Sequence, residues 1–133
     1  MIQHMADNVE HIYIALGYTD FRRQIAGLTA MVALQFKMDP YSGNTLFLFC
    51  NKRHTAIKAL RWDGNGFLLA TKSLANDMKF QWPKTKGELR DINVRQLQWL
   101  LEGLQIDQKR AHPQTVDTTS AVFLKQLFRT FIY

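Results

Sequence analysis

Most of the positive charge of this 133-residue chain lies in one central segment. The full sequence has 17 Lys and Arg against 11 Asp and Glu, a formal net charge of +6, and residues 51–90 alone hold nine of these bases and three of the acids. The bases of the segment are Lys52, Arg53, Lys58, Arg61, Lys72, Lys79, Lys84, Lys86 and Arg90, and its large aromatics are Trp62, Phe67, Phe80 and Trp82. Basic side chains can hold phosphates while aromatic rings between them stack on nucleobases. The segment therefore indicates a nucleic-acid-binding surface, unless its aromatics form the core face of a sheet and its lysines only solvate the other face.

Seven residues are the candidates for contact with nucleic acid. We expect phosphate contacts from Arg22, Arg23, Lys52, Arg53, Lys58 and Arg61, and stacking from Trp62. Arg22 and Arg23 fall in the first turn of a predicted helix, where the helix dipole disfavours positive charge by a few tenths of a kcal/mol. A local conflict of this kind points to function. Arginines that face solvent or pair with a distant acid would explain it equally well.

No catalytic or cofactor motif accompanies these bases. The four histidines, His4, His11, His54 and His112, lack the spacing of metal ligands, and the sequence has no phosphate-binding loop, dinucleotide fingerprint or serine elbow. We expect the single cysteine, Cys50, to be a small buried hydrophobe rather than a nucleophile. These features favour a non-enzymatic protein without a cofactor. A metal-dependent nuclease stays as a minor alternative, because acids that are distant in sequence can converge in a fold.

The elements that must position the bases predict an α+β fold. Hydrophobic periodicity and turn residues predict strands over residues 11–16, 45–50, 55–62, 67–72 and 78–82 and helices over 20–37 and 94–102. The Asp63–Gly66 turn predicts a hairpin, and strand 45–50, apolar on both faces, predicts the middle of a covered sheet. We expect Gly27 to permit a close contact between helix and sheet. The whole is a mostly antiparallel sheet of about four to five strands with two packed helices and an additional C-terminal helix.

We expect three parts along the chain: a single α+β domain over residues 9–107, a polar linker over 108–119 and a C-terminal amphipathic helix over 120–133. The apolar face of the last helix consists of Phe123, Leu124, Leu127, Phe128 and Phe131. Such a short helix must dock on its own domain, on a second copy of the chain in a homodimer, or on a partner protein. The apolar runs are too short to span a bilayer, the N-terminus does not read as a signal peptide, and one cysteine suits a reducing cytoplasm.

Several of these segments, taken in order, resemble a known family. They are Gly17–Arg23, Gly27–Leu28, Asp39–Gly43, Leu46–Arg53, Ile57–Lys58, Trp62–Phe67, Phe80–Pro83 and Leu100–Gly103. Their order and spacing are similar to TnpB, the small accessory protein encoded by the second reading frame of bacterial insertion sequences of family sixty-six. The resemblance covers about residues 9–107 and emphasises Thr19–Arg23 and the basic turn with Lys52, Arg53 and Lys58.

The resemblance implies a role in transposition beside a separate transposase that carries the strand-transfer chemistry. It supplies no catalytic residues. Our first hypothesis is a non-enzymatic accessory protein that binds the DNA of insertion-sequence ends, the transposase, or both through a basic face. The second is a protein adaptor or dimerisation module without direct DNA contact.

Overall fold

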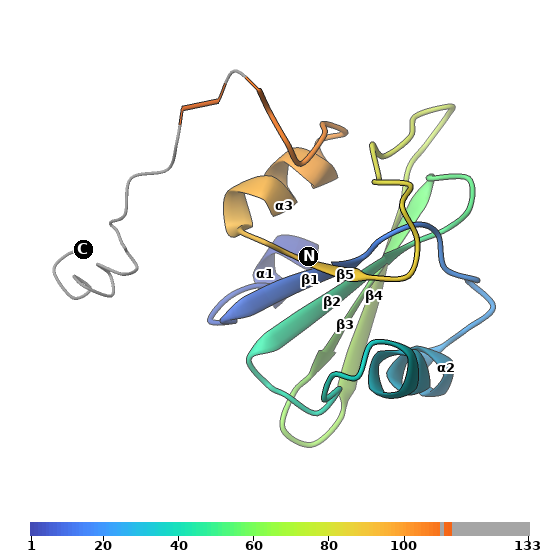
Figure 1. Ribbon diagram of the computed structural model, residues 1–133, viewed down its shortest axis with the longest axis vertical. Coiled ribbons are helices and arrows are strands. Elements are labelled where there is room, and N and C mark those ends of the chain that lie inside the picture. Colours follow the sequence, from blue (N-terminus) through green and yellow to red (C-terminus); the bar gives the residue numbers. More distant parts are fainter. Residues whose placement is uncertain (110, 113–133) are drawn as a thin grey trace, which may run out of the picture.

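The computed structural model describes residues 1–109 and 111–112. They form one five-stranded sheet with helices packed on it (Figure 1). The strands are β1 (His11–Ala15), β2 (Thr45–Cys50), β3 (Ala56–Trp62), β4 (Phe67–Ser73) and β5 (Leu89–Ile92), in the order β4-β3-β2-β1-β5. β1 and β2 pair in parallel, whereas the other three pairings are antiparallel. The predicted α+β fold with a mostly antiparallel sheet is confirmed.

The central strand β2 is buried at every position. Its side chains alternate between two cores: Leu46, Leu48 and Cys50 belong to one, and Phe47 and Phe49 belong to the other. A strand whose two faces are both covered needs apolar residues at consecutive positions. The predicted central place of this strand is therefore confirmed.

Helices cover both faces of the sheet (Figure 1). α1 (Ile2–Met5) and α3 (Val94–Leu101) supply buried residues to the core that contains Leu46, and α2 (Ile25–Ala30) and its π-helical continuation η1 (Met31–Gln35) supply the other core. α3 begins with a capping box: the Asn93 side chain accepts the Gln96 backbone N–H at 2.8 Å, and the Gln96 side chain accepts the Asn93 N–H at 3.0 Å. This reciprocal pair satisfies two backbone donors that the helix start would leave unpaired.

The helix predicted over residues 20–37 starts later than expected, at Ile25. The Asp20 side chain accepts the Arg22 backbone N–H at 2.9 Å, and the carbonyls of Phe21 and Arg23 accept hydrogen bonds from the Lys58 ammonium. These side-chain partners compete with the helical pattern for the same backbone groups. The prediction for Gly27 is also wrong, because a Cβ atom there would meet the Arg23 side chain at 3.1 Å rather than the sheet.

The edge strand predicted over residues 78–82 is not a strand. Burial nevertheless alternates along part of this segment, since Phe80 and Trp82 are buried while Lys79 and Gln81 are exposed. Met78, which a regular strand would bury on the same face as Phe80 and Trp82, is exposed. The edges of the sheet are β4 and β5.

The remaining predicted elements divide into confirmed and untested ones. The hairpin is confirmed, with Trp62 paired to Phe67 across the Asp63–Gly66 turn. The C-terminal helix predicted over 120–133, with Phe123, Leu124, Leu127, Phe128 and Phe131, lies outside the described residues. Within residues 1–109 and 111–112, no helix has the length and apolar character needed to cross a membrane.

Candidate nucleic-acid-binding cleft

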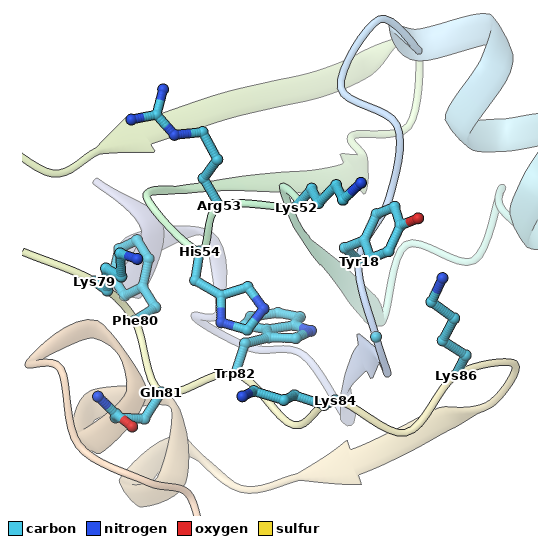
Figure 2. Close-up of a pocket in the computed structure, with 11 residues that line it drawn as sticks. Tyr18, Lys52, Arg53, His54, Lys79, Phe80, Gln81, Trp82, Lys84 and Lys86 are labelled. Atoms are coloured by element: carbon cyan, nitrogen blue, oxygen red, sulfur yellow. The ribbon is translucent and has the colours of Figure 1, made fainter.

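An open cleft of about 590 Å³ lies at the end of the sheet where β1 and β2 finish (Figure 2). Three segments line it: the residues after β1, the turn between β2 and β3, and the extended segment that precedes β5. The lining residues are Gly17, Tyr18, Lys52, Arg53, His54, Lys79, Phe80, Gln81, Trp82, Lys84 and Lys86. We call this site the basic cleft.

Backbone hydrogen bonds hold the three segments together. Because β1 and β2 are parallel, their carboxyl ends meet at one edge of the sheet, where the Thr19 N–H donates to the Cys50 carbonyl at 2.8 Å. The Phe80 N–H donates to the His54 carbonyl at 2.8 Å, and the Gly17 N–H donates to the Pro83 carbonyl at 3.0 Å. The extended segment is thereby tied to both of the other walls.

Two aromatic side chains anchor the extended segment in the core. Phe80 and Trp82 are 1% and 3% exposed, and the Trp82 indole N–H donates to the Ala15 carbonyl at 2.9 Å. Lys79 before them, Gln81 between them and Lys84 after them lie at the cleft wall (Figure 2). The alternating apolar and polar residues of this segment therefore form one wall of the cleft rather than a strand of the sheet.

The basic cleft concentrates positive charge without compensation. Lys52, Lys79, Lys84 and Lys86 line it, Arg53 extends outward at its rim, and no Asp or Glu is among the lining residues (Figure 2). In the described part of the chain, none of these five cations pairs with a carboxylate. Such a cluster attracts an anion because ligand binding relieves the mutual repulsion of the cations.

The pKa values of His54 and Tyr18 are both lowered in the cleft. Burial, and after it the charges of Lys84 and Lys79, lowers the pKa of His54 below its ordinary 6.5. The Lys86 ammonium, through hydrogen bonding and charge, and then Lys52 lower the pKa of the Tyr18 hydroxyl. Tyr18 is 41% exposed, and the centroid of its ring lies 3.8 Å from Lys86 Nζ and 5.6 Å from Lys52 Nζ.

Of the seven residues predicted to contact nucleic acid, only Lys52 and Arg53 line the cleft. Lys58 is 6% exposed, and its ammonium donates to the carbonyls of Phe21 and Arg23 at 3.0 and 2.9 Å. The Arg61 guanidinium instead donates to the carbonyls of Met5, Asp7 and Gly43. Both side chains hold distant segments of the chain against β3.

The other three predicted residues lie apart from the cleft lining. Arg22 pairs with Asp20 at 2.7 Å, and its hydrogen bonds hold the Asp20 pKa at about 2. Both arginines precede the helix, so the predicted conflict with its dipole does not arise. Trp62 packs against Tyr41 and Phe67, with ring centroids 5.0 and 4.9 Å away.

Sequence reasoning did not single out Tyr18, His54, Lys79, Gln81, Lys84 and Lys86 as site residues. Five of them belong to the basic segment 51–90, three of these are lysines, and their charge was the available signal. The predicted strand over 78–82 gave no reason for the lysines to approach the turn after β2. That approach depends on the bonds from Phe80 and Gly17.

The alternative chemistries gain no site in the described residues. No group of three His, Cys, Asp or Glu in residues 1–109 and 111–112 could hold a metal ion, so the nuclease hypothesis has no acid cluster there. Cys50 is fully buried, as expected, and burial raises the pKa of its thiol to about 12.

Comparisons with known proteins identify the family. The chain is 33% identical over 102 residues to the uncharacterized protein y4jC of Sinorhizobium fredii, covering 77% of this chain and 86% of that one. It is 37% identical over 103 residues to y4hO of the same organism, covering 77% and 84%. No solved structure matches it. The family model for IS66 Orf2-like proteins matches residues 10–111, which shows that the chain belongs to the TnpB family of IS66-type transposition accessory proteins.

Proposed function

We propose that this accessory protein binds DNA of the insertion-sequence ends through the basic cleft, in the bacterial cytoplasm and without catalysing a reaction itself. The observation that supports the proposal is the set of five cations at the cleft, none of which pairs with a carboxylate in the described residues. The DNA backbone is the polyanion that a transposition protein meets.

The proposal changes the expected contact set. Lys52 and Arg53 remain, and Lys79, Lys84 and Lys86 join them. Lys58 and Arg61 are given a structural role instead, because their donors already hold backbone carbonyls. Arg22, Arg23 and Trp62 do not line the cleft and are no longer expected to contact DNA.

The test compares two triple variants with equal loss of charge. The cleft variant is Lys79→Gln with Lys84→Gln and Lys86→Gln. The control variant is Lys37→Gln with Lys72→Gln and Lys109→Gln, whose side chains do not line the cleft. Affinity for element-end and random DNA is measured at several salt concentrations, and thermal unfolding shows that both variants fold.

Each phosphate contact contributes about 0.9 to the slope of log affinity against log salt for duplex DNA and about 0.7 for a single strand. The cleft variant should therefore lower the slope by about 2 to 3, whereas the control variant should lower it by less than 1. Equal losses for both variants would show that net charge rather than the cleft binds DNA.

Absence of binding by the natural protein at low salt would overturn the DNA proposal. If the protein bound no DNA but co-purified with the transposase at low salt, the adaptor hypothesis would be favoured. Deletion of residues 118–133 would then test whether the predicted C-terminal helix contacts the transposase.

A further inference from the structure

We propose that the basic cleft takes an unpaired nucleotide segment of DNA, single-stranded or frayed, in preference to an intact duplex. This inference rests on the proposed function and specifies its substrate. Three observations carry it: the concave shape of the site, the absence of a groove-reading element in its lining, and the aromatic and amide groups among its cations.

The first observation is the size and shape of the site. Its volume of about 590 Å³ falls in the range of about 300–1,000 Å³ that is typical of small-ligand sites. A space of that size suits one or two nucleotides. A paired strand keeps its bases stacked inside the helix and presents its backbone and only the edges of its bases. It would therefore contact the rim and leave the interior of the cleft unfilled.

The second observation concerns the elements around the cleft. Sequence-reading proteins place a helix or a two-stranded ribbon in the major groove of duplex DNA. The cleft is lined by a loop, a turn and an extended segment, and none of its lining residues belongs to α1, α2 or α3. Within residues 1–109 and 111–112, the site therefore has no projecting element that a duplex groove would receive.

The third observation is the chemistry of the lining. Tyr18 is exposed and lies between Lys52 and Lys86, and the Gln81 side chain is exposed at the opposite wall (Figure 2). Proteins that bind single strands combine a positive groove with aromatic rings on which bases stack. An amide side chain can both donate to and accept from a base edge.

The contact of Lys86 with Tyr18 suggests how the two groups work together. Without a ligand, the Lys86 ammonium lies 3.8 Å from the ring centroid. A cation–π contact at an exposed site is worth only about 0.5–1 kcal/mol, and a phosphate is a stronger partner for an ammonium group. A bound phosphate would draw Lys86 from the ring and leave the Tyr18 face to a base.

The experiment uses the full chain and three DNA probes of matched sequence: a 12-nucleotide single strand, a duplex with a single-stranded overhang, and a dumbbell duplex closed by loops too short to offer free bases. We expect the single strand and the overhang duplex to bind at least ten times more tightly than the dumbbell. Tyr18→Leu should weaken binding of the single strand by roughly 5- to 100-fold, the loss of one stacked base, and should leave dumbbell binding unchanged.

Tyr41→Leu is the matched control, because Tyr41 is an exposed tyrosine that does not line the cleft. It should leave affinity for the single strand unchanged, and thermal unfolding establishes that both variants fold. Equal or tighter binding of the dumbbell by the natural protein would overturn the inference while the proposed function stands. If the natural protein bound none of the three probes at low salt, both the inference and the proposed function would be overturned. Tighter binding of single-stranded RNA of the same sequence would overturn the assignment to DNA.

Discussion

Gly17 and Lys86 approach so closely that a Cβ atom on Gly17 would lie 2.5 Å from Lys86 Cγ and 3.2 Å from Lys86 Cα. Gly17 also has a φ of +77°, which residues with a side chain rarely adopt. The extended segment that carries Lys86 therefore packs directly against the residues that follow β1. A glycine at this position therefore gives the cleft its width and places Lys86 beside Tyr18.

Gly17→Ala should weaken both the fold and the cleft. The backbone conformation alone costs about 1–2 kcal/mol for a residue with a Cβ atom, and displacement of Lys86 adds to it. We expect the free energy of unfolding in urea to fall by about 2 kcal/mol or more and DNA affinity to fall several-fold. Gly64→Ala is the control, since Gly64 has a φ of +83° and no atom within 4 Å of the added Cβ. It should lose about 1–2 kcal/mol of stability, the cost of the backbone conformation alone, and keep its DNA affinity.

Lys58→Met should destabilise the fold without a specific effect on the cleft. The buried Lys58 ammonium is the donor that holds the carbonyls of Phe21 and Arg23. Its loss leaves these acceptors without that partner and should lower the free energy of unfolding by about 1–3 kcal/mol. Lys84→Met is the counterpart: it should keep its unfolding midpoint and lose DNA affinity. A fully stable Lys58→Met would mean that water replaces the lysine at no cost.

The sequence was sufficient to predict most of the sheet but not the site. Apolar runs and turn residues predicted four of the five strands, because β2 is buried on both faces and the hairpin turn has strong local preferences. β5 was missed: its four residues, Leu89–Ile92, carry two charges and no pattern distinguishable from a loop. It exists because it pairs with β1, which is a tertiary effect.

Charge concentration pointed to the segment that lines much of the basic cleft, but several of the predicted side chains lie elsewhere. Lys58 and Arg61 are three positions apart on one strand, and an odd offset places two side chains on opposite faces of the sheet. That argument was available in the sequence and already excluded a common surface for the two. The approach of Lys84 and Lys86 to Lys52 was not available, since it depends on hydrogen bonds between segments far apart in the chain.

The Cys50 thiol should be inert in the folded protein. The residue has no exposed surface, and burial raises the pKa of its thiol to about 12, so almost no thiolate exists near neutral pH. At pH 8, iodoacetamide should label the native protein at least a hundred times more slowly than the urea-unfolded chain, as followed by mass spectrometry. Rapid labelling of the native protein would contradict the burial of the β2 end.

His54 should make both stability and DNA binding depend on pH, with opposite signs. Burial and the charges of Lys84 and Lys79 hold its pKa below 6.5 in the folded state, so the unfolded chain takes up the proton first. The free energy of unfolding should therefore fall as pH drops below about 6.5, until the pH passes the pKa of the folded state. A phosphate in the cleft would raise that pKa, so DNA affinity should increase over the same range.

His54→Asn is the variant that tests this dependence. The residue has a φ of +60°, a conformation that asparagine adopts more readily than most residues. The variant should retain the fold, and both its stability and its DNA affinity should vary less with pH than those of the natural protein. His11→Asn, which alters the exposed pair with Asp91, is the control and should leave the pH dependence of DNA binding unchanged. If DNA affinity in the His54→Asn variant still rose as steeply on acidification, the protonated group would lie outside the cleft.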